Sequence, residues 1–462
     1  MICLDYKPLT EGGREGTRYF ASTAQPGYTP PCYNTVRDTL MPDALQEMND
    51  GLRDLLKKGD GFVVSADIWT SRRGHSFLAI VATFIDGSFR GHTSLLSCDN
   101  IKGHHTAERI YQIYESVLKY WNIEGRVIRV VTDSASNMVK AFNILPVTEE
   151  TTTGDDDGSA ECDEEEDMPA LSQMEVDAVT ANAENMIYTY FTASSLYLRC
   201  PIHLLQLAIK DAISEHSNVT RLLAKVGNLT DLTNTLQKEL GNLGMILPAV
   251  SELKSLLTKE AALPMAIAAF SETLANNTTA RYSGYYTDKH LLLASVLDPR
   301  FKTEWIIRDE HVCNRLGEIR DLLVEETERM NSPLGAPNPT HTSSEAPESE
   351  DSEPKKSRLF GSYFSEQLRT PEDVKGEVEK FLSTPRQNPD TDVIQYWMEN
   401  SKLYPRLVKV ACVVFSIPSG SASVERVFSA AGLVSRSHRT SLKPEILSRL
   451  VLLKVNAKEL SR

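Results

Sequence analysis

One order of elements constrains the fold of this chain more than any other feature, and it begins with three short strand-like runs between residues 61 and 99. The runs are FVVSADIW, SFLAIVATFI and FRGHTSLLSC, and the turn-like stretches SRRGH and DGS separate them. Short runs joined by tight turns pair most simply with their neighbours in sequence. They therefore predict a small antiparallel meander.

A helix and a buried strand are expected to follow the meander. The segment TAERIYQIYESVLKYW places apolar residues at helical spacing from Ile110 to Trp121, with Thr106 as its N-cap. The run VIRVVTD is apolar almost throughout, as in a strand that is buried on both faces. Three strands, a helix and a buried strand form the order of a ribonuclease H-like core.

The rest of the chain is mainly helical in pattern. YLRCPIHLLQLAIKDAI predicts a strand end that passes into an amphipathic helix, and helical patterns continue to about Leu382 and resume after Thr391. We expect an α/β fold, a ribonuclease H-like core interrupted by an all-helical insertion, with a helical C-terminal region. The expected parts are an N-terminal helical remnant (1–58), the first part of the core (59–147), an acidic disordered insert (148–178), a core strand and helix (179–213), a helical insertion (214–385) with a disordered loop (331–357), and the C-terminal region (386–462).

Composition places the chain among globular proteins that stay inside the cell. It is 41% hydrophobic and 24% charged, and it has neither an apolar run of roughly 20 residues for a membrane span nor a secretory signal. Seven cysteines stand singly along 462 residues, which fits reduced thiols. No C-x-x-C pair occurs, so we expect no zinc finger of the Cys2His2 type.

The negative charge of the chain comes from one segment. The formal net charge is −14, and thirteen acidic residues with no Lys or Arg lie between Glu149 and Asp177. Like charges at this density repel one another and predict disorder. The remainder of the chain is close to neutral, so the acidic balance does not exclude contact with nucleic acid.

Four motifs occur in a fixed order. They are VSADIWTS with Asp67, VVTDSASNM with Asp133, CPIH from Cys200 to His203, and SGSASVERVFSAAGLV around Glu425. Together with the C-terminal SRLVLLKVN, they resemble the hAT transposase family, particularly its domesticated members related to the BED-finger proteins. The resemblance runs from about Pro8 to Asn456 with gaps, and SASVERVFSAAG is its most specific part.

The resemblance implies an acidic triad of Asp67, Asp133 and Glu425. Transposases of this class use two divalent ions for strand cleavage and transfer, so three carboxylates must converge. If the site is active, Mg²⁺ or Mn²⁺ would be the cofactor, because hard cations prefer carboxylate oxygens. Without the family, Asp67 reads as a solvated strand-end residue, Asp133 as a turn former, and Glu425 as a first-turn acid that complements a helix dipole.

Cys200 and His203 form the CPIH motif. Their spacing of three would put both on one face of a helix, as half of a zinc site. No second pair completes such a site, and the resemblance makes the motif structural and related to the DNA end. Buried, neutral packing is the alternative that we favour.

The C-terminal helices carry the prediction of a homodimer. LVKVACVVF is apolar nearly all round, and the helix that opens with Pro444 has two apolar faces. One face can pack on the chain's own core, and the other suits a second subunit, which agrees with the dimerisation region that the resemblance implies here. The alternative is that one monomer covers both faces. The expected dimerisation residues are Phe428, Leu433, Leu447, Leu450, Val451 and Leu453.

Two features of complete family members are missing from the printed sequence. The chain starts at MICLDYKPLTEG, where the family would already be past its zinc finger, and it contains no Arg-Trp pair. We therefore expect a domesticated nuclear homodimer in DNA-associated or transcriptional regulation, with weak DNA affinity and no small-molecule substrate or membrane partner. The alternatives are an active Asp-Asp-Glu transposase or nuclease, and a chain truncated by gene decay.

Overall fold

The computed structural model describes residues 9–71, 73–103, 105–133, 135–143, 197–216, 240–259, 265–332, 373–435 and 442–460. The predicted acidic insert lies outside these residues, as does almost all of the loop predicted at 331–357.

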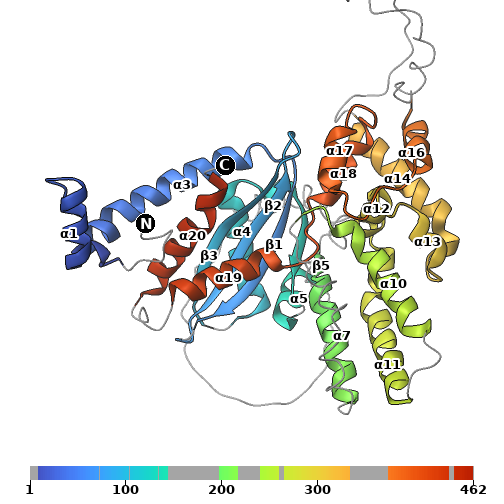
Figure 1. Ribbon diagram of the computed structural model, residues 1–462, viewed down its shortest axis with the longest axis horizontal. Helices are drawn as coiled ribbons and strands as arrows, with labels where there is room; N and C mark the ends of the chain where they lie inside the picture. Colours follow the sequence, from blue (N-terminus) through green and yellow to red (C-terminus); the bar gives the residue numbers. More distant parts are fainter. Residues whose placement is uncertain are drawn as a thin grey trace, which may run out of the picture.

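A five-stranded mixed sheet forms the centre of the fold (Figure 1). Its strand order is β3-β2-β1-β4-β5. The first three strands pair antiparallel, and β4 and β5 run parallel to β1. The predicted antiparallel meander is therefore confirmed. The strands are β1 (Phe62–Thr70), β2 (Ser76–Ile85), β3 (Gly91–Ile101), β4 (Val127–Thr132) and β5 (Tyr197–Arg199).

Helices make up most of the remaining described residues, so the fold is mixed α/β and mainly helical. The α-helices are α1 (Glu15–Ala24), α2 (Tyr33–Thr35), α3 (Met41–Leu56), α4 (Ala107–Trp121), α5 (Ser136–Asn143), α7 (Pro201–Glu215), α10 (Ile246–Lys259), α11 (Met265–Tyr282), α12 (Lys289–Leu297), α13 (Glu304–Arg308), α14 (Leu316–Asn331), α16 (Val374–Ser383), α17 (Val393–Glu399), α18 (Leu407–Phe415), α19 (Ala422–Val434) and α20 (Pro444–Leu460).

The two faces of the sheet pack against different helices. Because side chains alternate along a strand, Leu78 and Ile80 of β2 join the apolar cluster under α3 and α4, whereas Phe77 and Ala79 join the cluster under α19 and α20. The predicted N-cap of α4 is confirmed, since the Thr106 hydroxyl accepts a hydrogen bond from a backbone N–H at 3.3 Å. The sheet is thus covered on both faces by helices of one chain.

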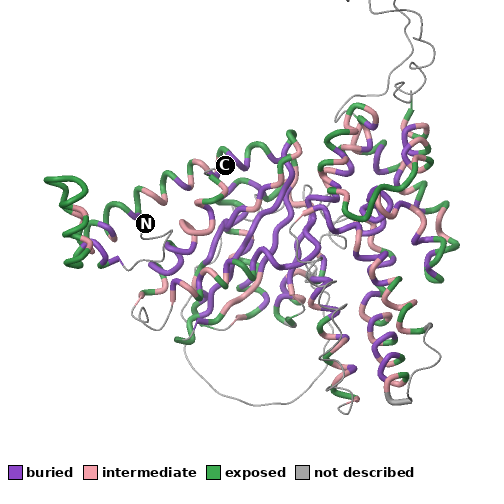
Figure 2. Tube along the Cα trace, in the orientation of Figure 1, coloured by how far each residue is buried: buried purple, intermediate pink, exposed green. Residues whose placement is uncertain are grey.

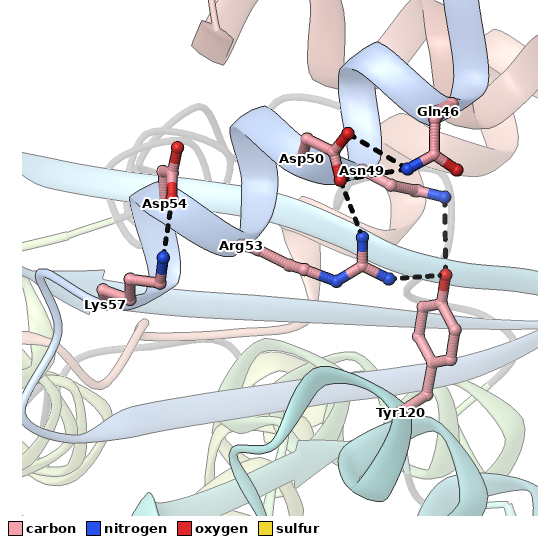
Figure 3. A network of polar contacts seen from close by, with 7 residues as sticks. All are labelled: Gln46, Asn49, Asp50, Arg53, Asp54, Lys57 and Tyr120. Atoms are coloured by element: carbon pink, nitrogen blue, oxygen red, sulfur yellow. Dashed lines mark hydrogen bonds and ion pairs between the residues drawn. The ribbon is translucent and has the colours of Figure 1, made fainter. Parts of the chain in front are cut away.

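Helix α3 is fastened to α4 by a polar network (Figure 3). Arg53 donates to the Tyr120 hydroxyl at 3.0 Å and to Asp50 at 3.0 Å, and its guanidinium lies 5.3 Å from the centre of the Tyr120 ring. The carboxylate of Asp50 also accepts from Gln46. The hydrogen bond from Arg53 to Tyr120 joins residues 67 positions apart in the sequence and holds α3 against α4.

Helices α10 to α18 form a second apolar body beside the sheet (Figure 1). The buried Arg129 of β4 reaches into this body. Its guanidinium pairs with Asp288, the N-cap of α12, and donates to Nδ1 of His290 at 2.8 Å. Burial, assisted by the Arg129 charge, lowers the pKa of His290 to about 4. A neutral imidazole therefore accepts from Arg129, and this polar contact joins the sheet to the helical body.

Helix α20 is docked on the sheet through a side chain that apolar patterning does not reveal. The pairing of β2 with β3 shifts by one residue at Leu96, where a bulge leaves strand backbone without its ladder partner. The buried Asn456 accepts from Leu95 N at 2.8 Å and donates to Leu95 O at 2.9 Å. From α4, the Trp121 indole donates to Leu96 O at 3.1 Å.

Helix α20 packs against β3, α3 and α19 of its own chain, and Leu452, Leu453 and Val455 are half-buried there. Leu447, Leu450 and Val451 of α20 are buried in the monomer by these contacts. The expected contact of one α20 face with a second subunit stays a prediction.

Candidate functional site

The three predicted acids come from three elements that meet at one end of the sheet. Asp67 lies three residues before the end of β1, and Asp133 follows directly after β4. The last registered pair of these parallel strands is Ala66 with Thr132, so Asp67 and Asp133 are neighbours one step further along. Helix α19 packs on β1 and β2 and carries Glu425 in its first turn. The topology thus brings the predicted residues to one region.

The charges of these residues interact. The pKa of Asp67 is raised to about 7, chiefly by burial and also by the negative charges of Asp133 and Glu425. The Ile68 N–H, which donates to Asp67 Oδ1 at 2.7 Å, opposes the shift. A carboxyl with such a pKa is protonated in about half of the molecules near neutral pH. The acids therefore share one electrostatic environment.

The carboxylates are nevertheless not gathered into a ligand set. Among the described residues, no three His, Cys, Asp or Glu side chains lie close enough together to hold a metal ion. Asp133 accepts from the Ala135 N–H at 3.1 Å, and the exposed Glu425 accepts from the Ser421 hydroxyl at 3.5 Å. The donor chemistry suits a hard cation, but this arrangement does not fit a two-metal site, and we derive no catalytic step through one.

Cys200 connects the elements that carry Asp133 and Glu425. Its backbone N–H donates to the Thr132 carbonyl at the end of β4 at 2.8 Å, and its sulfur accepts from the N–H of Ser421 at 3.4 Å, just before α19. Cys200 is the N-cap residue of α7, and His203 is half-buried in the first turn of that helix. Burial raises the pKa of the thiol, which favours the neutral form.

Gly420 explains why two motifs 220 residues apart meet so closely. A Cβ at this position would lie 2.8 Å from Ile202 Cδ1 and 3.3 Å from the Cys200 sulfur. Only glycine lets the backbone before α19 approach the CPIH segment without displacing a side chain. The sequence presents the two motifs separately, and the contact between them is a finding of the structure.

Two further residues at this site were not singled out from the sequence. The Thr132 hydroxyl and the Tyr197 hydroxyl both donate to the Asp133 carbonyl, at 2.9 and 3.2 Å. They hold the backbone on which the Asp133 side chain stands. Tyr197 begins β5, and only the parallel pairing of β5 with β4 brings it here. No sequence pattern indicates that pairing at the level of one residue.

The predicted dimerisation residues serve the core of the monomer in this structure. Phe428 is half-buried, with its ring 6.3 Å from that of Trp69. Leu453 is also half-buried against the apolar clusters, and Leu433 is partly exposed. Their role between subunits stays a prediction.

Comparisons with known proteins bear on the same two regions. The model of the hAT family C-terminal dimerisation region matches residues 377–457, and the model of the ZBED1 RNase-like domain matches residues 65–156. These matches cover the C-terminal helices and the sheet strands that carry Asp67 and Asp133. The chain therefore contains an RNase-like domain and an hAT dimerisation region.

Three relatives extend the comparison. The zinc finger BED domain-containing protein DAYSLEEPER of Arabidopsis thaliana is 22% identical over 98% of this chain and 71% of its own length. The putative AC transposase of Zea mays is 21% identical over 94% of this chain and 61% of its own. The putative transcriptional regulator tpeD of Talaromyces stipitatus is 31% identical, over 25% of this chain and 14% of its own.

The chain is thus homologous to hAT transposases and to BED-type proteins, as the motifs indicated. It spans 71% of the length of the DAYSLEEPER protein, 61% of the putative AC transposase and 14% of tpeD. Within the ranges that the structure describes, none of the helices has the length and apolar character of a membrane span.

Proposed function

We propose that this protein is a transposase-derived nuclear protein that acts as a homodimer in DNA-associated or transcriptional regulation. The observation that carries the proposal is the contrast between a fully docked C-terminal region and three acids that do not form a ligand set. A regulatory dimer needs the first feature and can dispense with the second.

The C-terminal region is part of the fold and not an appendage. Asn456 satisfies backbone groups of β3, and Val424 and Val451 are buried against the sheet. Loss of this region would open the apolar face of the meander. Every folded copy of the chain therefore presents the matched dimerisation region in one arrangement, which supports dimer formation.

Nuclear, DNA-associated action is supported by the kinds of relatives found. Two of the relatives described above are named as a BED-type zinc finger protein and a putative transposase, and a third is named as a putative transcriptional regulator. The charge of the chain argues for weak direct binding, because affinity for phosphates depends on Lys and Arg. We expect non-specific DNA affinity of about 10⁻⁵ M, falling steeply with salt.

Sedimentation equilibrium on the full chain tests the dimer. The expected mass at micromolar concentration is twice the 51.5 kDa of one chain. Imaging of a tagged full chain tests localisation, with accumulation in the nucleus expected. A monomer across the micromolar range, or exclusion from the nucleus, would contradict the corresponding part of the proposal.

The second candidate is a metal-dependent transposase or nuclease that uses Asp67, Asp133 and Glu425 with Mg²⁺ or Mn²⁺. The observation that favours it is the raised pKa of Asp67, to which the other two charges contribute. Incubation with either metal and a DNA end compares wild type with Asp133→Asn, and the exposed Glu124→Gln serves as a matched control. Cleavage lost only in Asp133→Asn supports the candidate, and equal cleavage in all three proteins rules out the triad.

A further inference from the structure

The N-terminal unit, defined here as residues Glu11–Leu40, lies beyond the sheet at the far end of α3 (Figure 1). Its main helix is α1, and no residue of α1 is buried. Figure 2 shows the same helix as one of the most exposed parts of the molecule. Helix α1 therefore buries little of its surface against the rest of the described residues.

Large apolar side chains on this unit face solvent. Tyr19 is 75% exposed and Phe20 is 73% exposed, while Tyr28 and Leu40 are 49% and 46% exposed. They are four of the ten exposed large apolar residues among the described positions, within a segment of thirty residues. Single exposed apolar residues are ordinary, but a group of them marks an interaction surface.

The helix also lacks the packing that a helix of its length needs. Isolated helices shorter than about 12 to 15 residues are marginal in water, and most of their stability in proteins comes from a packed apolar face. Helix α1 has ten residues. The Glu11 carboxylate holds it locally, through Thr17 at 3.1 Å and Arg14 at 3.4 Å. Polar contacts of this kind add little, so an apolar partner is expected on Tyr19 and Phe20.

The position of the unit points to a second copy of this chain as that partner. Leu9, Val36 and Met41, which flank α1 on either side, are buried in the same apolar cluster as Val427 of α19 and Leu450 of α20. The unit is thus continuous with the matched dimerisation region. Leu447, Leu450 and Val451 of α20 are buried in the monomer, whereas Tyr19 and Phe20 of α1 are the most exposed large apolar side chains beside this region.

The charge of the unit permits self-association. Between Glu11 and Leu40 there are three acidic and three basic residues, which sum to zero in a chain of net charge −14. Two copies of the unit can therefore approach without net charge repulsion between them. Symmetric dimers use the same patch on both subunits, which a neutral apolar patch allows.

We propose that α1 docks against a second copy of this chain, with Tyr19 and Phe20 as the anchoring side chains of the dimer interface. Aromatic residues that become fully covered commonly dominate the affinity of such interfaces. The inference rests on the proposed homodimer and assigns its surface to a segment outside the matched dimerisation region.

Sedimentation equilibrium on the full chain tests this assignment with the double variant Tyr19→Ala and Phe20→Ala. The expected result is a dimer dissociation constant raised about 100-fold or more, with unchanged circular dichroism because both side chains are exposed in the monomer. The matched control is Leu256→Ala with Ile307→Ala, which removes two exposed apolar residues, 56% and 61% exposed, from the helical body. The control is expected to dimerise like wild type.

Hydrogen exchange provides a second readout. Amides of α1 are expected to exchange slowly in concentrated wild type and quickly on dilution to monomer. A wild type that dimerises while the double variant dimerises equally well overturns the α1 assignment alone. A wild type that is monomeric throughout overturns the proposed homodimer and this assignment together. Protection of α1 that does not change on dilution shows that a segment of the same chain covers it, which also overturns the assignment.

Discussion

The two motifs that point most strongly to a transposase ancestry meet the same sheet in different ways. Helix α20 is buried and hydrogen-bonded to the backbone of β3 through Asn456. At the carboxyl end of β1, which is called the acidic end here, Asp67 is half-buried beside two like charges, and Glu425 is exposed. Packing therefore holds the C-terminal region in place, whereas the acids contribute repulsion and desolvation.

This difference shows which region the fold depends on. Removing the docking of α20 leaves unpaired backbone groups and an open apolar face, both of which lower stability. Removing a charge from the acidic end relieves a cost of burial. A protein can keep such a destabilising group because it serves a function. Substitutions in the two regions therefore have opposite expected effects on the free energy of unfolding.

The largest effect is expected from Asn456→Leu. The change leaves Leu95 N and Leu95 O without partners at the bulge, and two buried unsatisfied groups together cost about 4 kcal/mol. The free energy of unfolding in urea measures the loss. The exposed Arg449→Ala on the same helix is the matched control, with a change within about 0.5 kcal/mol. A small effect of Asn456→Leu would mean that packing alone docks α20.

The next effect concerns the pH dependence of stability through Asp67. Its pKa is about 7 in the folded chain and about 3.9 when unfolded. Between these values the unfolded chain releases the proton while the folded chain keeps it, so stability falls as pH rises from about 4 to 7 and then levels off. Unfolding free energies at several pH values measure the slope.

In Asp67→Asn this slope is expected to disappear, which makes the variant more stable than wild type by at most about 4 kcal/mol above pH 7 and equal to it near pH 4. The exposed Asp60→Asn, just before the same strand, is the control and should keep the wild-type slope. An unchanged slope in Asp67→Asn would mean that another titratable group causes the pH dependence of the unfolding free energy.

A smaller effect is expected at the contact that joins the two ends of the site. Gly420→Ala places a Cβ 2.8 Å from Ile202 Cδ1, and overpacking of this kind costs about 1 to 2 kcal/mol. Ile202→Val removes that carbon and is expected to rescue much of the loss in the double variant. Gly432→Ala in α19 meets nothing within 4 Å and should be neutral or stabilising. Additive single changes would show that the contact carries no coupling.

The sequence predicted the elements of this fold better than their contacts. Alternation and turns located the meander, and the apolar run VIRVVTD located β4. That run hides Arg129, whose partners Asp288 and His290 lie about 160 residues away. A buried charge is tolerated only with such partners, and no local pattern reveals them.

The candidate site was predicted in its residues but not in its arrangement. The motif order placed Asp67, Asp133 and Glu425 together, and the sheet brings their elements to one end. The link through Cys200 and Gly420 depends on the path of the backbone. The burial of α20 in the monomer likewise depends on α3, which packs against α20 and is held to α4 by the contacts of Arg53 with Tyr120. The apolar pattern of the sequence does not reveal these contacts.

The smallest effect distinguishes a shared site from three separate acids. Asp133 raises the pKa of Asp67 more than Glu425 does, so Asp133→Asn should move the midpoint of the Asp67-linked loss of stability to lower pH, and Glu425→Gln should move it less in the same direction. The Asp67→Asn background is the control, since neither change should then affect the slope. Equal midpoints in all proteins would mean that burial alone sets the pKa of Asp67. If Glu425→Gln shifts the midpoint more than Asp133→Asn does, the first turn of α19 lies closer to Asp67 in solution than in this structure. That result would favour the metal-dependent candidate over the regulatory dimer.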